Sequence, residues 1–390
     1  MKGQIRKLRP LALALIFPLL IAAAPAEKKQ SDWNHFRGPS LDGQAPGKLS
    51  SSLVRKWQKK VGSPALSSPT VRAKRVYIGS TENAVLSLSL DEGSELWRTP
   101  VSSSIEAPPL LEKHSLVVGS MDGTVYSLEL ESGKLNWTYK TEAKILGSAI
   151  PVSLGKGKKI IVIGSYDGSL HAIDSATGKK LWKFSTQNHL HSSPILWKKN
   201  LVIGGCDSRL HIVSPIDGKE IKFVELGAQI GATPLIEGNQ AFVGTYGNRF
   251  LNIDLDKSAV LWEYRDQGFP FFSSASRNEN TLFVGSRDRK LHALDRETGD
   301  AMWTFRTQGK IDGSPVLSDG KVVFGSSDGR IYLVDAESGA KLWSYDLGGA
   351  IEATPAVWNG MVLVGTSEGV LHAFGPPTQT QPPNQTKAQP

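Results

Sequence analysis

The chain has 390 residues, a formal net charge of +8, one cysteine and 39% hydrophobic residues. A single cysteine excludes an internal disulfide, so stability has to come from a packed core, for which the chain is long enough. The first 26 residues carry four of the positive charges, which leaves about +4 on the rest. Without a concentrated basic face, so small a charge argues against nucleic-acid binding.

The N-terminus has the pattern of an export signal. Four basic residues between Lys2 and Arg9 precede the apolar run Leu11 to Ala24, and Ala24-Pro25-Ala26 fits a cleavage site. That run is shorter than the ~20 residues that span a bilayer. We therefore expect residues 1–26 to be a signal peptide, 27–52 a leader segment, and the protein to be periplasmic or secreted without a stable membrane span. The alternative is a signal kept as an anchor; no cysteine near the site could carry a lipid.

A repeat of about forty residues fills the chain from Leu53 to Phe374. Each copy has an aliphatic run ending in glycine, a polar turn, an alternating strand, a second turn and Leu-Trp or a variant of it. The first glycines are Gly79, Gly119, Gly164, Gly204, Gly244, Gly285, Gly325 and Gly365, spaced by 40, 45, 40, 40, 41, 40 and 40 residues. Several strand signals within such a period predict a β-propeller blade.

The third copy shows how one blade is built. We expect an inner strand at 148–152, a buried strand at 159–165, a third strand at 170–174 and an outer strand at 180–184. Asp167-Gly168 suits the tight turn between the middle strands. Only this copy has about five extra residues, around Gly155-Lys156-Gly157. The other loops are close to the minimum for a hairpin.

Large aromatic residues share one phase of the repeat and are expected to wedge between neighbouring blades. They are Trp57, Trp97, Trp137, Trp182, Phe223, Trp262, Trp303 and Trp343. The last copy ends at Phe374 without an outer strand, whereas Leu53 to Gln58 supplies one at the other end of the chain. We therefore predict an all-β, eight-bladed propeller of four-stranded antiparallel blades over 53–375, closed by the N-terminal strand. The Pro/Gln-rich residues 376–390 read as a disordered tail.

The sequence resembles the pyrroloquinoline-quinone (PQQ) repeat family. The resemblance rests on Asp167-Gly168, Leu170 to Asp174, Thr177-Gly178-Lys179 and Leu181 to Phe184, and on the leader motif Trp33 to Pro39. It implies a quinoprotein alcohol dehydrogenase-like fold. One branch of the family comprises dehydrogenases that hold PQQ and calcium on the propeller axis; the other comprises binding propellers such as the outer-membrane assembly lipoprotein BamB.

No residue pattern predicts catalysis or a metal site. The family's dehydrogenases use an adjacent cysteine pair and long loops over the cofactor, and this chain has only Cys206 and short loops. Four histidines recur in the third strand, at 171, 211, 292 and 372, in a slot that Tyr126 and Tyr332 fill in other copies. Equivalent slots are rotated apart around the ring, so packing explains them better than zinc binding.

One set of residues departs from the repeat. The positions before the small residues of each inner strand are Leu66, Glu106, Gly147, His191, Gly231, Phe272, Asp312 and Glu352. Glu106, His191, Asp312 and Glu352 are therefore a candidate site at one mouth of the channel, able to bind a cation, a basic peptide or a small polar ligand. The simpler interpretation, a hydrated rim, is the one we favour.

These observations favour a monomeric, non-enzymatic scaffold that binds an envelope protein and needs no cofactor, as BamB does, with a role in outer-membrane protein assembly. The missing lipid anchor departs from BamB. The alternatives are a PQQ-dependent dehydrogenase with calcium and a propeller that binds a small ligand or carbohydrate.

Overall fold

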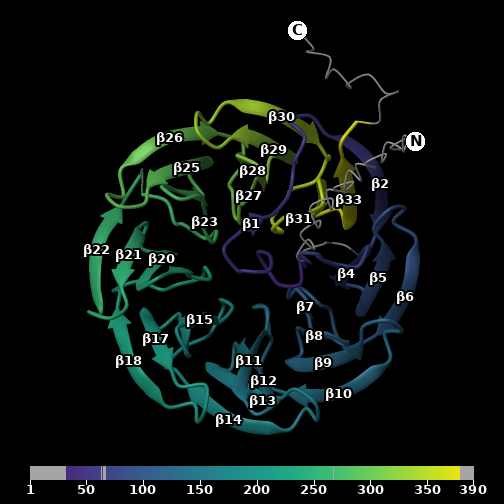
Figure 1. Ribbon diagram of the computed structural model, residues 1–390, viewed down its shortest axis with the longest axis vertical. Coiled ribbons are helices and arrows are strands. Elements are labelled where there is room, and N and C mark those ends of the chain that lie inside the picture. The colour runs from purple at the N-terminus through teal and green to yellow at the C-terminus, as the bar shows by residue number, and fades with distance from the viewer. Residues whose placement is uncertain (1–31, 63, 65–66, 267, 378–390) are drawn as a thin grey trace, which may run out of the picture. The chain divides into compact units, whose positions relative to one another are not determined.

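The computed structural model describes residues 32–62, 64, 67–266 and 268–377. Every regular element in these residues is a strand, and the strands form eight sheets around one axis (Figure 1). The prediction of an all-β, eight-bladed propeller is confirmed. One sheet has a fifth strand, because β1 pairs in parallel with β27.

The blades follow one another in chain order. The first four contain β3 (Thr70–Arg72), β4 (Arg75–Ser80), β5 (Ala84–Ser89) and β6 (Glu95–Pro100); β7 (Leu110–Leu111), β8 (Ser115–Gly119), β9 (Thr124–Glu129) and β10 (Leu135–Lys140); β11 (Ile150–Gly155), β12 (Lys158–Ser165), β13 (Ser169–Asp174) and β14 (Lys180–Ser185); β15 (Ile195–Trp197), β16 (Asn200–Gly204), β17 (Arg209–Val213) and β18 (Glu220–Glu225). The last four contain β19 (Leu235–Glu237), β20 (Gln240–Gly244), β21 (Phe250–Asp254) and β22 (Ala259–Tyr264); β23 (Ser276–Arg277), β24 (Thr281–Gly285), β25 (Lys290–Asp295) and β26 (Ala301–Arg306); β27 (Val316–Ser318), β28 (Lys321–Gly325), β29 (Arg330–Asp335) and β30 (Lys341–Asp346); β31 (Ala356–Trp358), β32 (Met361–Gly365) and β33 (Val370–Gly375). The leader contributes β1 (Gln44–Ala45), and β2 (Val54–Lys60) follows it.

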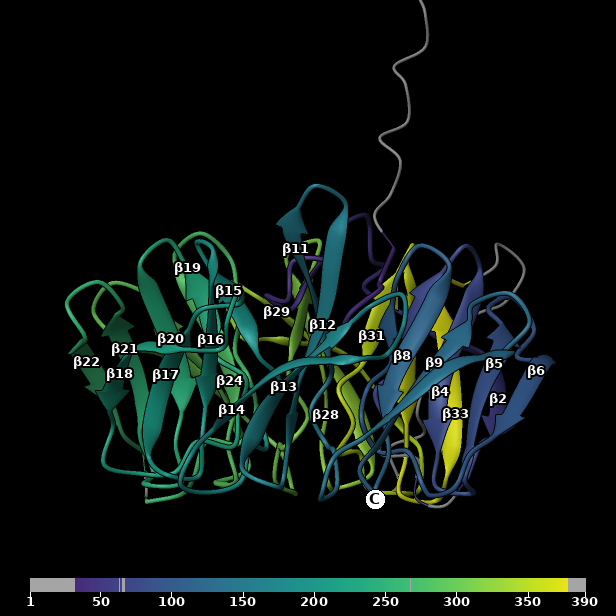
Figure 2. The same ribbon diagram turned by 90° about the horizontal axis from the view of Figure 1, so that it is seen from below.

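The strand sequences explain the layers of a blade. The second and third strands, such as β12 and β13, are almost wholly buried because neighbouring blades cover both of their faces. The outer strands are largely exposed. The extra residues of the third copy lengthen β11 and β12, and their hairpin stands above the rest of the disc (Figure 2).

The ring closes as predicted. β2 pairs antiparallel with β33 and places Trp57 opposite Ala373, so the N-terminal strand is the outer strand of the eighth blade. Without β2 the edge of β33 would be unpaired, so this strand completes the eighth blade.

Tryptophans of the outer strands join neighbouring blades. Six indole nitrogens donate to a carbonyl oxygen of the next blade: Trp57 to Leu90 (2.7 Å), Trp97 to Leu130 (3.2 Å), Trp137 to Ser175 (3.1 Å), Trp182 to Pro215 (3.0 Å), Trp262 to Arg296 (3.1 Å) and Trp303 to Ala336 (3.3 Å). Trp343 instead packs on Phe374, with ring centroids 5.3 Å apart. Phe223 differs, because its ring is 41% exposed and lies beneath the Arg209 guanidinium.

The close approach of these rings explains a recurrent glycine. At Gly93, with φ of +71°, a Cβ atom would lie 2.5 Å from the Trp57 ring. A side chain there would clash with the ring and strain the backbone, so the turn requires glycine.

The leader crosses the centre of the ring (Figure 1). Trp33 is 2% exposed, and its carbonyl accepts the N–H of Val71 on β3; the Asn34 carbonyl accepts the N–H of Leu111 on β7. Farther along the chain, β1 pairs with β27. The leader therefore links the first and second blades to the seventh through the centre of the ring.

Two buried contacts fix the leader between these ends. Arg37 donates to the carbonyl of Ala275. Gly43 approaches Ser276 so closely that a Cβ atom on it would lie 2.7 Å from that side chain. The leader is thus packed into the propeller, which nothing in the repeat predicts.

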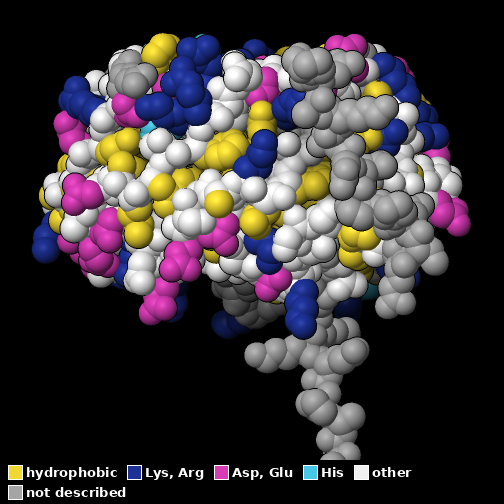
Figure 3. Space-filling view, turned by 90° about the horizontal axis from the view of Figure 1, so that it is seen from above, with side chains coloured by type: hydrophobic (Ala, Val, Ile, Leu, Met, Phe, Trp, Pro, Cys, Tyr) yellow, Lys and Arg dark blue, Asp and Glu magenta, His cyan; other side chains and the backbone are white. Residues whose placement is uncertain are grey.

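The outer wall separates charge along the axis. In the left half of Figure 3, Lys and Arg side chains gather toward one edge and Asp and Glu toward the other, with apolar side chains between them. β26 shows the cause: its N-terminal end follows Glu297 and Asp300, Met302 is exposed, and it ends at Arg306.

Candidate functional site

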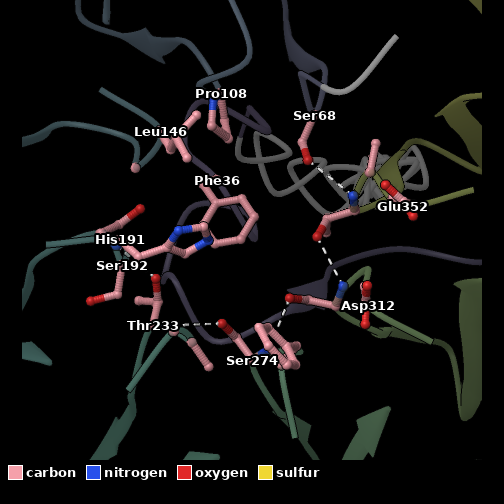
Figure 4. A pocket seen from close by; sticks show the side chains of 18 of the residues that line it. Phe36, Ser68, Pro108, Leu146, His191, Ser192, Thr233, Ser274, Asp312 and Glu352 are labelled. Carbon is pink, nitrogen blue, oxygen red and sulfur yellow. Dashed lines mark hydrogen bonds between the residues drawn. The ribbon is translucent and has the colours of Figure 1, made fainter. Parts of the chain in front are cut away.

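The four residues predicted at the channel mouth line one pocket on the propeller axis. Glu106, His191, Asp312 and Glu352 line a cavity of about 190 Å³. Figure 4 shows His191, Asp312 and Glu352 around it. All four precede an inner strand, whereas the leader contacts later residues of those strands, such as Leu317 and Asp319. The pocket and the leader's strand pairing are therefore at opposite ends of the inner strands.

The register in the third blade corrects one predicted position. The N–H of Ser148 donates to Ser193 Oγ, and the N–H of Ser193 donates to Thr233 Oγ1 in the same way. Ser148 is thus equivalent to Ser193, and Leu146, not Gly147, is the counterpart of His191. The extra residues of the third copy lengthen one glycine spacing to 45 and obscured this one-residue shift. Leu66, also in the predicted set, lies outside the described residues.

A ring of hydroxyl groups holds the inner strands together below this mouth. In each of six contacts a backbone N–H donates to a Ser or Thr oxygen of the next blade, at 2.8–3.0 Å. The acceptors are Ser193, Thr233, Ser274, Ser314, Thr354 and Ser68. Pro108 interrupts the ring because it has neither the N–H nor the hydroxyl. Small hydroxyl residues recur here since they join blades that converge on the axis.

Phe36 of the leader also lines the pocket. Its ring lies among the residues of the inner strands, near Leu146 and Pro108 in Figure 4. Because the leader crosses the axis, its aromatic side chain forms the inner end of the pocket, so the site is a blind recess bounded by the leader.

Two of the three carboxylates are ion-paired. Arg287 Nε and Nη2 donate to the two oxygens of Asp312 at 2.9 and 3.0 Å. Lys310 Nζ lies 2.6 Å from Asp312 Oδ2 and 2.9 Å from Glu352 Oε1. Burial opposes the charge of Lys310, but its hydrogen bonds to both acids raise its pKa above the ordinary value.

Glu106 and His191 differ from this pair. Glu106 is half-buried and makes no hydrogen bond or ion pair with any described residue; burial raises its pKa, while the charge of Lys144 acts in the opposite direction. Burial and Lys144 lower the pKa of His191, which keeps its imidazole neutral. His191 Nδ1 is hydrogen-bonded to the Tyr166 hydroxyl at 2.5 Å.

Aromatic and cationic side chains lie around the mouth, and of these the sequence reasoning gave Phe272 but missed Tyr166, Tyr246 and Arg287. Tyr246 packs edge-on against Phe272 with ring centroids 4.3 Å apart, and the Arg287 guanidinium lies 3.6 Å from the Phe272 centroid. Tyr166, Tyr246 and Arg287 each stand two residues after a first glycine. That position reads Thr81, Met121, Tyr166, Cys206, Tyr246, Arg287, Ser327 and Ser367 around the ring. The residue type at this position varies from copy to copy, and this variation is the sequence signal that could have identified these residues.

Three of the four recurrent histidines bond to the first hairpin turn, whereas neither ring nitrogen of His372 has a hydrogen-bond partner among the described residues. Nε2 of His171, His211 and His292 lies 2.9, 2.9 and 3.0 Å from the aspartate four residues earlier. Asp266, Asp288 and His292 are close enough to hold a metal ion, but Lys290 Nζ lies 2.6 Å from Asp266 Oδ2 and 3.8 Å from Asp288 Oδ2. An ammonium therefore already pairs with Asp266 and offsets part of the negative charge of that cluster.

Comparison with known families identifies the chain. The model of the outer membrane protein assembly factor BamB family matches residues 47–183, 166–277 and 270–378. The chain belongs to this family. The search of curated proteins gives no match. Within the described part of the chain, no helix is long and apolar enough to cross a membrane.

Solved structures share the fold at low sequence identity. BamB from Moraxella catarrhalis is 16% identical with a TM-score of 0.71, over 84% of this chain and 98% of that one. The quinohemoprotein alcohol dehydrogenase of Comamonas testosteroni is 13% identical with a TM-score of 0.75, over 90% and 82%. A similar enzyme from Pseudomonas putida is 14% identical with a TM-score of 0.75, over 91% and 82%. These likenesses support the quinoprotein alcohol dehydrogenase-like fold and do not separate a scaffold from an enzyme.

Proposed function

We propose that this BamB-family propeller is a non-enzymatic, exported scaffold that binds a protein of the cell envelope and serves outer-membrane protein assembly. Family membership supports the assembly role. The observation that carries the non-enzymatic part is the leader on the axis: Phe36 bounds the axial pocket and leaves a volume of about 190 Å³. Pockets for drug-sized ligands usually have ~300–1,000 Å³.

The residues of the pocket do not fit the quinone of the dehydrogenases. PQQ is a tricarboxylate and needs cationic partners, yet no Lys or Arg is among the described residues that line the pocket. Calcium would need several oxygen ligands, whereas Asp312 and Glu352 share Lys310 and only Glu106 of the three acids is unpaired among the described residues. We therefore derive no catalytic step through either group.

The assembly role is tested in the organism itself. We expect deletion of the gene to lower the amount of folded β-barrel protein in the outer membrane and the intact gene to restore it. Unchanged amounts of every outer-membrane barrel would contradict the assembly role.

The non-enzymatic role has a separate test. Purified protein is mixed with PQQ and calcium, and tryptophan fluorescence and dye-linked oxidation of alcohols and sugars are followed. We expect neither saturable binding nor turnover. Binding with turnover would establish the dehydrogenase alternative.

A further inference from the structure

We propose that the axial pocket binds one primary ammonium group, the side chain of a lysine that the partner protein inserts, with Glu106 as its counter-ion. This inference rests on the proposed scaffold function and adds the chemistry of the partner. It starts from the arrangement of charges around the pocket.

The acids lie on one side of the mouth. In ring order, Asp312, Glu352 and Glu106 come from the seventh, eighth and second blades, and only the first blade intervenes. On the opposite side, Leu146 and Phe272 of the third and sixth blades line the pocket beside polar residues, among them His191, Ser193, Thr233 and Ser274. The acids therefore lie on one side and apolar groups interspersed with hydroxyl groups on the other, which gives an alkyl chain that ends in a cation one preferred orientation.

The cations near these acids do not line the pocket. Arg287 and Lys310 pair with Asp312 and Glu352, and Lys144 lies over the Tyr166 ring, 4.5 Å from its centroid. His191 lines the pocket as a neutral imidazole. The described lining residues thus include three acids and no Lys or Arg, and Asp312 and Glu352 already have cationic partners, which leaves Glu106 for a ligand.

Of the three acids, Glu106 is the one without a hydrogen-bond or ion-pair partner among the described residues. A half-buried carboxylate without a hydrogen bond or ion pair is costly, and an ammonium at this place would satisfy it. At the inner end, the Phe36 ring can pack against the alkyl chain. An ammonium over the face of the ring would gain a cation–π contact. The volume of about 190 Å³ suits one side chain.

The mouth is accessible to a partner. Glu352 is exposed, and Tyr246, which packs on the lining residue Phe272, is an exposed aromatic side chain. Aromatic and arginine side chains around a central recess are typical of protein interfaces. A lysine inserted at the centre with aromatic residues around it is therefore a coherent docking mode.

The test uses small probes in place of the partner. N-acetyl-lysine methylamide, the isosteric N-acetyl-norleucine methylamide, 1,5-diaminopentane and glucose are titrated into the full chain and followed by calorimetry. We expect saturable binding of the lysine probe with a dissociation constant on the order of 1–10 mM, and no binding of norleucine or glucose.

Two variants and one control locate the site. Glu106→Gln should weaken the lysine probe about tenfold or more, because a charged hydrogen bond is lost. Phe36→Leu, which keeps an apolar inner end, should weaken it about threefold. Glu142→Gln removes an exposed carboxylate outside the pocket and should change nothing. Circular dichroism checks that each variant is folded.

Each other result overturns the proposal. Equal binding of norleucine would show an apolar site, and binding of glucose alone a carbohydrate site. Binding of the diamine without the lysine probe would show a free amine as ligand, and no saturable binding of any probe would show a hydrated rim. In cells, normal barrel assembly with Glu106→Gln but not with the gene deleted would refute the lysine anchor and leave the scaffold function intact.

Discussion

The two ends of the propeller axis have the same eightfold framework and opposite character. At the leader end, Trp33 and Arg37 are buried and the chain pairs with inner strands of the first and seventh blades. At the mouth, Glu106, His191, Asp312 and Glu352 line a recess that opens to solvent. With the repeats alone, each end of the channel would be lined by equivalent residues from all eight blades. The leader occurs once in the chain and fills only one end, so the other end stays open.

This difference indicates which end of the propeller serves stability and which serves binding. The leader is held by apolar burial and backbone pairing, so we expect its variants to act on stability. The mouth is held by partly exposed ion pairs, so its variants should act mainly on binding. The following predictions test that division, from the largest expected effect to the smallest.

Truncation of the leader's main anchor should have the largest effect. Trp33→Ala removes a side chain that is 2% exposed and should lower the free energy of unfolding by about 3–5 kcal/mol. Chemical denaturation followed by fluorescence measures the change. Phe36→Ala is the control on the same segment: its ring faces the pocket, so its loss should cost clearly less. Equal costs would contradict the division between the two ends.

Acidification should destabilise the leader end. Burial, with the charge of Lys159, lowers the pKa of His35 from 6.5 to about 4. The unfolded chain then binds the proton before the folded one does, so stability is full above about pH 6.5 and falls as the pH drops toward 4. The full shift is worth at most about 3 kcal/mol.

The variant His35→Phe isolates this contribution. His372 has the same lowered pKa of about 4 and remains in both proteins, so the difference between their unfolding curves reports His35 alone. We expect the variant to lose less stability than the wild type between pH 7 and pH 4.5. Parallel curves would contradict a buried, neutral His35.

The contribution of Glu106 at the mouth to the unfolding free energy should change with pH in the opposite direction to that of His35. Burial raises the pKa of Glu106, so the folded state binds its proton first, and this contribution is present at low pH and lost as the pH rises through the folded pKa. Glu106→Gln should remove that slope and leave the unfolding free energy at acid pH little changed. A variant that is less stable than the wild type at neutral pH would show that Glu106 has a stabilising partner.

The repeat made most of the fold predictable. The glycine phase located the blades, and the missing outer strand after Phe374 predicted the pairing of β2 with β33. These features recur or complete a recurring unit, so each copy supports the others. Comparison of the copies failed where one copy differs, because the insertion near Gly155 hid the equivalence of Leu146 and His191.

The site was only partly predictable because its geometry depends on residues outside the repeat or on long side chains. One position of the repeat stood out because it carries ionisable residues in only four copies, namely Glu106, His191, Asp312 and Glu352. Phe36 could not be placed, since a leader present once has no second copy that shows where it packs. Lys310 could have been noticed, because it stands two residues before Asp312 and so points to the same side of an extended chain.

The ion pairs of the mouth should give the smallest change in stability. Asp312→Asn removes the carboxylate that Arg287 and Lys310 share, at side chains that are partly exposed. Such pairs contribute about 0–1 kcal/mol, and Arg287 keeps its contact with the Phe272 ring. Thermal unfolding should therefore shift by only a few degrees. Glu95→Gln, at an exposed pair with Arg98 on an outer strand, is the matched control. If Asp312→Asn were as costly as Trp33→Ala, the mouth would be a structural element like the leader end, and its polar residues would no longer be free to serve binding.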